Sequence, residues 1–111
     1  EVRLPDGRAA ALRLHRPGYQ SVAAIRSELW WMQALARAGL PVPMPVATAS
    51  GDLVDQGRRA ATMIGWVPGD PMGEAEVPLP GDHATRCARF RAVGALLGRL
   101  HDATDALTLP P

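Results

Sequence analysis

The sequence predicts an α+β fold in which an antiparallel sheet carries one packed helix and is followed by a linker and one long C-terminal helix. Three observations support this prediction. Apolar residues alternate with polar ones on both sides of an early Pro-Asp-Gly turn, as in a β-hairpin. They then recur every three to four residues, as in an amphipathic helix. A segment rich in proline and glycine separates this part from a second helical pattern.

The first predicted element is a β-hairpin over residues 1–16, with Pro-Asp-Gly at 5–7 as its turn. Proline fixes one backbone angle, aspartate hydrogen-bonds within the turn, and glycine tolerates a positive φ. In the second strand the period of two puts Leu12 and Leu14 on one face and Arg13 on the other. The strand therefore presents a cation on one side of the sheet.

The second predicted element is an amphipathic helix that begins after Ser21, whose hydroxyl suits an N-cap. Gly39 offers the left-handed conformation that commonly ends helices, and three prolines follow it in "LPVPMP". We therefore expect the helix to end just before Gly39. Its apolar face consists of Val22, Ile25, Leu29, Met32 and Ala36.

Two further strands are expected in residues 45–54 and 58–67, next to the turn-like stretches 50–52 and 56–57. The second strand is the more apolar, so it should lie at the centre of the sheet. The proline- and glycine-rich residues 68–82 should have little regular structure. A second long helix follows, with Asp82 as its N-cap and with Phe90, Val93, Leu97 and Leu100 on one face.

Composition and the distribution of reactive residues exclude several classes of function. Twelve arginines, no lysines and eleven acids give a net charge of +1, which offers no electrostatic basis for binding nucleic acid or a membrane. The single cysteine, Cys87, cannot form an internal disulfide, and no Cys/His spacing resembles a zinc site. No serine or cysteine has the partners of a nucleophilic catalyst. We expect a cytoplasmic protein, because no apolar run is long enough to span a bilayer.

Arg13 and Glu28 are the first candidate functional residues. A strand and the helix that packs on the same sheet can bring such side chains together, and an arginine–carboxylate pair is a strong contact. On spacing alone, two unrelated solvated charges are the more common outcome. Ile25 and Leu29, however, put the apolar face of the helix next to Glu28. We therefore expect Glu28 at the edge of the core.

The stretch "MIGWVPGD", residues 63–70, is the second candidate site, because an apolar strand ends there in a Pro-Gly turn. The last residues of such a strand expose backbone donors and acceptors that a flat aromatic ligand could use. An ordinary strand end is the simpler interpretation of the same pattern.

Together these elements resemble the aminoglycoside phosphotransferase family of protein-kinase-like enzymes, which includes choline kinase-like and type II homoserine kinase-like members. The stretches "LRLHRPGY", "SELWWMQAL" and "GLPVPMPV" are similar to its N-terminal lobe, from the second strand through the helix. "WVPG" and "FRAVGALLGRLHDA" are similar to the hinge and to the first helix beyond it. The resemblance covers nearly the whole chain.

The resemblance implies that Arg13 and Glu28 act together on a nucleotide. Arg13 stands where the family usually has a lysine that holds the α- and β-phosphates of ATP. Glu28 stands where the helix acid orients that cation. Arginine in place of lysine keeps the charge and adds planar donors, but it loses the compact ammonium group.

The resemblance also implies a hinge at residues 64–67. Ile64 matches the gatekeeper position, Gly65 would offer its carbonyl to the adenine amino group, and Val67 would offer its N–H to the ring nitrogen. Trp66 lies between them at the hinge.

The resemblance further divides the chain into three parts. Residues 1–69 correspond to an N-terminal lobe without its first strand and glycine-rich loop, residues 70–82 to a linker, and residues 83–111 to the first helix of a C-terminal lobe. Nothing in the sequence matches the family's catalytic loop or its magnesium-binding aspartate, so we expect no catalytic residue and no metal ligand in this chain. The parent protein would use ATP and Mg to phosphorylate a small-molecule hydroxyl acceptor, and the chain alone would be an inactive fragment.

A second hypothesis is a non-catalytic binding or assembly module with a lobe-like fold. In it, Arg13 and Glu28 form a structural ion pair and an exposed tryptophan serves as a contact. We also expect a homo-oligomer, because the apolar side of the last helix would be left exposed, and such patches drive association.

Overall fold

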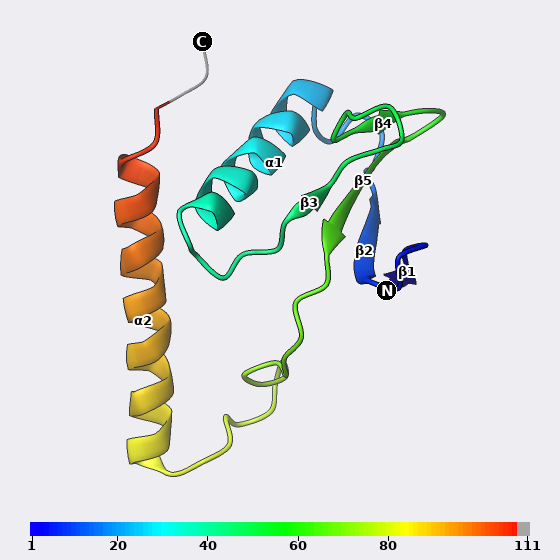
Figure 1. Cartoon of the computed structure of the whole chain (residues 1–111). Coiled ribbons are helices and arrows are strands. Elements are labelled where there is room, and N and C mark those ends of the chain that lie inside the picture. Colours follow the sequence, from blue (N-terminus) through cyan, green and yellow to red (C-terminus); the bar gives the residue numbers. More distant parts are fainter. Residues whose placement is uncertain (109–111) are drawn as a thin grey trace. The chain divides into compact units, whose positions relative to one another are not determined.

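The structure is a computed structural model that describes residues 1–108 (Figure 1). The chain divides into two compact units, Glu1–Val67 and Pro68–Pro111. The predicted last region, residues 83–111, extends beyond the described part of the chain, so its final three positions lie outside the described residues.

The first unit is an antiparallel sheet with one helix, α1, which confirms the predicted α+β class for this part. The strands run in the order β1-β2-β5-β3, and β4 also pairs with β5. β5 thus pairs with β2, β3 and β4, as its apolar sequence predicted for a central strand. The strands are β1 Val2–Arg3, β2 Ala9–Leu14, β3 Pro45–Val46, β4 Asp55–Gln56 and β5 Ala60–Gly65.

The predicted hairpin is formed by β1 and β2, with Val2 opposite Ala10. In its turn, Gly7 has a φ of +86° and donates its N–H to the Leu4 carbonyl (2.9 Å). Asp6 accepts a hydrogen bond from the N–H of Arg8 (3.0 Å). The aspartate and the glycine of the Pro-Asp-Gly triplet therefore have the roles that their types predict.

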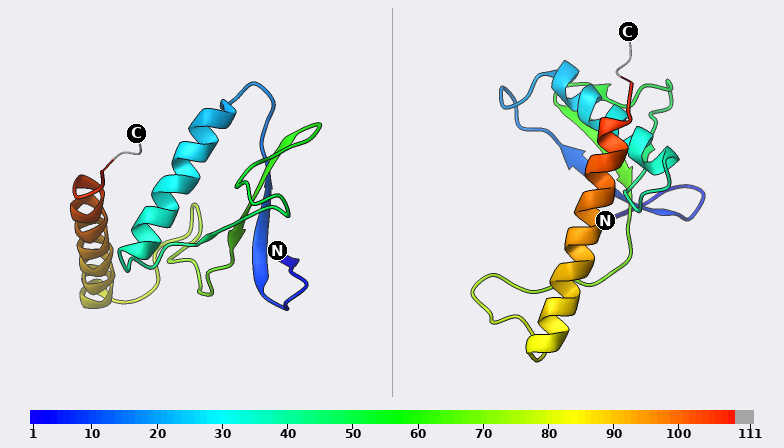
Figure 2. Two further views of the ribbon diagram at one scale, coloured as in Figure 1. Left: turned by 45° about the horizontal axis from the view of Figure 1, so that its top comes forward. Right: turned by 90° about the vertical axis from the view of Figure 1, so that its left-hand side faces the viewer.

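Helix α1 spans Val22–Arg37 and lies along one face of the sheet (Figure 2). Its start is fixed by Ser21, whose Oγ accepts the N–H of Ala24 (3.1 Å). Its end is followed by Gly39, which has a φ of +86° and donates its N–H to the Ala36 carbonyl (3.0 Å). Both ends agree with the prediction.

The core of the first unit lies between α1 and the sheet. Ile25 and Leu29 of α1 form one buried cluster with Val54, and none of the three is more than 2% exposed. Ala60 and Ile64 of β5 pack against this cluster from the sheet. Burying a large aliphatic side chain contributes about 1.5–3 kcal/mol. These contacts therefore fix the position and rotation of α1 on the sheet.

Residues 45–54 do not form the long strand that their sequence predicted. Only β3 pairs with β5, after which the chain turns, with Thr48 donating its N–H to the Asp52 carbonyl (2.8 Å). The Asp52 carboxylate accepts the next two backbone N–H groups at 2.7 and 3.3 Å. These local bonds replace sheet pairing and direct Val54 into the core. β4 then forms where a turn was expected, and the bend follows it.

The second unit has neither helix nor strand between Pro68 and Asp82. It then contains the predicted long helix, α2, at His83–Asp105. Asp82 caps this helix, because its carboxylate accepts the N–H of Thr85 (2.8 Å). Within the described part of the chain, neither helix is long and apolar enough to cross a membrane.

Helix α2 presents large apolar side chains to solvent. Phe90 is 56% exposed and Leu97 is 50% exposed, and their spacing of seven residues puts them on one face of the helix. No residue of α2 is buried. The second unit by itself does not cover this face.

We propose a homo-oligomer, with a dimer as its smallest form, that associates through this face of α2. Replacing both Phe90 and Leu97 by serine should raise the dissociation constant of the dimer by about a hundredfold or more, since each large apolar side chain contributes about 1.5–3 kcal/mol when buried. Ala95→Ser, at an exposed position on the same helix, should leave it unchanged. Sedimentation velocity measures both. A wild-type chain that stays monomeric at high concentration would contradict the prediction.

Candidate functional site

Arg13 of β2 and Glu28 of α1 form an ion pair in which Arg13 Nη1 donates to Glu28 Oε1 at 2.8 Å. The predicted contact between the two residues is therefore confirmed. Their side chains are 43% and 33% exposed, so the pair lies at the edge of the core, where solvent and ligands can reach it. Its position follows from the strand's alternation, which points Arg13 toward α1 and leaves Leu12 and Leu14 exposed.

A second polar contact lies beside the ion pair and was not predicted from the sequence. Thr62 stands opposite Arg13 in β5 and is only 3% exposed. Its Oγ1 lies 2.9 Å from His15 Nε2, so the buried hydroxyl has a hydrogen-bond partner. The signal was a threonine in an otherwise apolar central strand. His15 thus satisfies the hydrogen-bonding capacity of a buried hydroxyl.

The predicted hinge residues occupy the end of β5 and the residues just after it. Ile64 stands opposite Ala11 and packs on the core from the face that carries Arg13. Ile64 lies two positions along β5 from Thr62, which is opposite Arg13, so the backbones of Ile64 and Thr62 are about 7 Å apart along the strand. The structure therefore places Ile64 and Arg13 on the same face of the sheet, close enough for one ligand to contact both.

Hydrogen bonds at the end of β5 point alternately to the two neighbouring segments. Gly65 donates its N–H to the Met44 carbonyl (2.8 Å), and Trp66 donates its N–H to the Ala9 carbonyl (3.1 Å). Gly65 thus faces the edge away from β2, whereas Trp66 faces β2. The side chains of Trp66 and Val67 are exposed.

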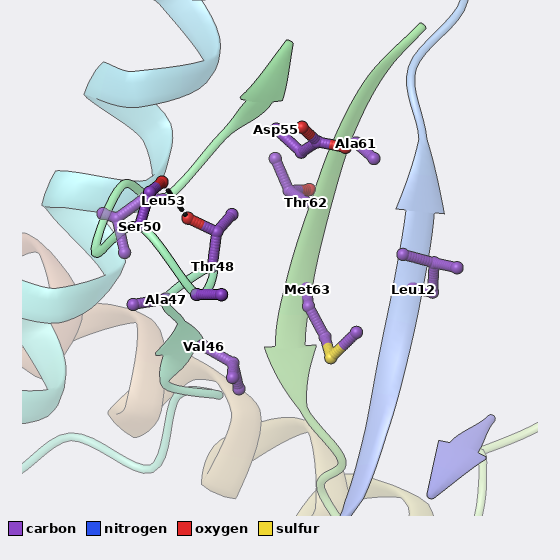
Figure 3. Close-up of a pocket in the computed structure, with 11 residues that line it drawn as sticks. Leu12, Val46, Ala47, Thr48, Ser50, Leu53, Asp55, Ala61, Thr62 and Met63 are labelled. Atoms are coloured by element: carbon purple, nitrogen blue, oxygen red, sulfur yellow. Dashed lines mark hydrogen bonds between the residues drawn. The ribbon is translucent and has the colours of Figure 1, made fainter. Parts of the chain in front are cut away.

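A cavity of the first unit lies on the other face of the sheet (Figure 3). It has a volume of about 490 Å³ and is lined by Leu12 and Met63, which are paired across β2 and β5. Alternation puts these two side chains on the face opposite to Arg13. The loop hydroxyls of Thr48 and Ser50 form part of its wall. None of the six predicted site residues lines this cavity, so it is separate from the ion pair.

A second ion pair attaches the loop before β4 to α1. Arg26 Nη2 hydrogen-bonds to Asp52 Oδ2. This bond, together with those from the N–H groups of Val54 and Leu53, holds the pKa of the Asp52 carboxyl below its usual value. Asp52 therefore organises the loop and joins it to the helix that carries Glu28. Sequence reasoning identified Asp52 only as a turn residue.

An antiparallel sheet that carries one helix is consistent with a kinase-like N-terminal lobe. The chain belongs to the phosphotransferase enzyme family, which it matches over residues 1–111. The resemblance noted in the sequence is thereby confirmed.

A relative from Deinococcus radiodurans, named as an uncharacterized protein, is 32% identical over 108 residues. The match covers 93% of this chain and 28% of the relative, so the chain spans little more than a quarter of that protein's length. No solved structure matches the chain significantly. The family assignment therefore rests on the chain's own sequence, and the relative's name adds no activity to it.

The lowered pKa of Asp52 predicts a loss of stability in acid. A carboxyl group with a depressed folded pKa contributes stability above its unfolded pKa, about 3.9, and this contribution is lost as the pH falls through the folded value. The free energy of unfolding should therefore decrease below about pH 4, and less steeply in Asp52→Asn. Urea denaturation followed by tryptophan fluorescence measures this, because all three tryptophans belong to the first unit.

Asp70→Asn is the matched control, since this exposed carboxylate lies outside the first unit. It should keep the acid dependence of the wild type. An Asp52→Asn variant with the same acid dependence as the wild type would show that the contacts of Asp52 do not contribute to it.

Proposed function

We propose that the chain is the N-terminal-lobe portion of an ATP-dependent phosphotransferase that transfers the γ-phosphate to a hydroxyl group of a small molecule. One observation carries this proposal, namely the 2.8 Å contact between Arg13 and Glu28 on the face of the sheet that α1 covers. Family membership supports phosphotransfer as the type of reaction. ATP as the donor and a small-molecule alcohol as the acceptor are part of the proposal.

The donor capacity of Arg13 supports a role in holding phosphates. A guanidinium has five N–H donors, and among residues 1–108 the Arg13 side chain pairs only with Glu28, through one of them. The remaining donors can reach a ligand, because the side chain is nearly half exposed. Glu28 orients the cation, and Arg13 neutralises charge on the α- and β-phosphates.

The energetics of the pair favour this role over a purely structural one. An ion pair as exposed as Arg13–Glu28 contributes only about 0–1 kcal/mol to folding. A hydrogen bond from the guanidinium to a charged phosphate contributes about 1.5–3 kcal/mol to binding. Arg13 would therefore contribute more free energy to nucleotide binding than the Arg13–Glu28 pair contributes to folding.

The end of β5 supplies the second half of the proposed nucleotide site. The backbone of Gly65 faces away from β2, so its carbonyl would accept the adenine amino group on that side. The N–H of Val67 would donate to the ring nitrogen on the same side. Ile64 would lie between this edge and the phosphates. The site thus combines an apolar, flat end with a cationic end, as a nucleotide requires.

Magnesium and the catalytic base are proposed to be supplied by parts of the protein outside this chain. No three His, Cys, Asp or Glu side chains of residues 1–108 are placed to hold a metal ion. Because phosphoryl transfer depends on positioning and charge neutralisation by such groups, we propose that the chain alone binds nucleotide weakly and is catalytically inactive.

We predict that ATP binds the chain with a dissociation constant of about 1 mM or weaker and shifts the amide NMR signals of Gly65 and Val67. Arg13→Gln should weaken this binding by about tenfold or more, because it removes charge-assisted donors. Arg37→Gln, at an exposed arginine in the last turn of α1, serves as the matched control and should not change it.

The same titration decides between the two hypotheses. If ATP leaves the signals of residues 64–67 unchanged, or binds the Arg13→Gln variant as it binds the wild type, the nucleotide site is wrong and the non-catalytic module is favoured. Phosphate release from ATP by the purified 111-residue chain would contradict its proposed inactivity.

A further inference from the structure

A small cavity at the end of the sheet remote from Gly65 is lined by cations. It has a volume of about 280 Å³ and lies between the segment that joins β2 to α1 and the bend that joins β4 to β5. Arg16, Arg58 and Arg59 all line it, and none of its lining residues is an aspartate or a glutamate. The whole chain carries a net charge of only +1, so this concentration of positive charge is local.

The three arginines differ in how firmly they are held. Arg59 is fixed by a hydrogen bond from its Nε to the His15 carbonyl (2.9 Å), and the ring of His15 is itself bonded to Thr62. Arg16 and Arg58 are exposed and pair with no carboxylate among residues 1–108. No carboxylate of the described residues therefore offsets the charges of Arg16 and Arg58.

The remaining lining residues add donors and no negative charge. Gln20 and Gln56 carry side-chain amides that can donate hydrogen bonds. Helix α1 begins at Val22, which also lines the cavity, so the positive end of the helix dipole adds to the field of the arginines. The volume lies just below the usual range for drug-sized ligands and is sufficient for a phosphate or a pyrophosphate group.

We propose that this cavity binds a small, multiply charged phosphate-bearing anion, at a site separate from Arg13 and Glu28. Neither of these two residues lines it. His15, which lines the cavity, follows the end of β2 and lies two residues beyond Arg13, about 7 Å away along the chain, on the side of Arg13 remote from the hinge. Guanidinium groups match phosphate geometry through paired N–H donors, so phosphate oxygens should be preferred over chloride.

Pyrophosphate is the probe, titrated into the 111-residue chain at constant ionic strength and followed by the arginine Nε–Hε NMR signals. The signals of Arg16, Arg58 and Arg59 should shift together with one dissociation constant. Replacing both Arg16 and Arg58 by glutamine should weaken binding by about tenfold or more, as the loss of two charge-assisted contacts requires. Arg91→Gln, at an exposed arginine of α2, should leave binding unchanged.

Two further experiments identify which phosphate-bearing anions bind and whether they bind in this cavity. If a phosphoryl group is sufficient for binding, inorganic phosphate and glycerol phosphate should both compete with pyrophosphate. Competition by inorganic phosphate alone would restrict the site to inorganic phosphates. Arg13→Gln should not alter pyrophosphate binding. The proposal is overturned if Arg13→Gln abolishes the binding, or if pyrophosphate shifts no arginine signal of the cavity in the wild type. The wild-type shifts decide the outcome even if the double variant fails to fold.

Discussion

The packing of Ile25 and Leu29 against the sheet determines where the charged groups of the first unit lie. Both side chains are about 1% exposed, and they leave α1 little freedom to rotate or slide. Glu28 precedes Leu29 directly, so the same contacts hold its carboxylate over β2, within hydrogen-bond distance of Arg13. A rotation of the helix by one residue would move Glu28 about 100° away from the sheet and separate the pair.

The stability of the first unit depends mainly on apolar contacts and little on the Arg13–Glu28 ion pair. The apolar contacts of α1 each contribute about 1.5–3 kcal/mol, whereas an exposed ion pair contributes about 0–1 kcal/mol. Loss of the Arg13–Glu28 contact would therefore lower the stability of the fold only slightly. The ion pair of Arg26 and Asp52 joins α1 to the loop that precedes Val54, a residue of the core.

Much of the first unit could be predicted from its sequence because the relevant signals are local. The Pro-Asp-Gly turn, the Ser21 cap and the Gly39 stop each act within a few residues, and the Arg13–Glu28 contact follows from two periodicities that meet across the core. The loop at residues 45–54 could not be predicted, since its alternation resembles a strand.

The structure of that loop depends on one carboxylate that accepts local backbone N–H groups and a guanidinium from α1. The cavity lined by Arg16, Arg58 and Arg59 was missed for a related reason. Its arginines come from segments more than forty residues apart in the chain, and only the pairing of β2 with β5 brings them together. Contacts between segments so far apart in the chain leave no periodic pattern in the sequence.

A double-mutant cycle on ATP affinity, with Arg13→Gln, Glu28→Gln and the double variant, tests the central claim that Glu28 acts on the nucleotide through Arg13. The losses of affinity should be non-additive by about 1 kcal/mol or more, because Glu28→Gln should have little effect once Arg13 is gone. The free energies of unfolding should change by less than about 1 kcal/mol. Additive losses, or an unchanged affinity in both single variants, would contradict the account.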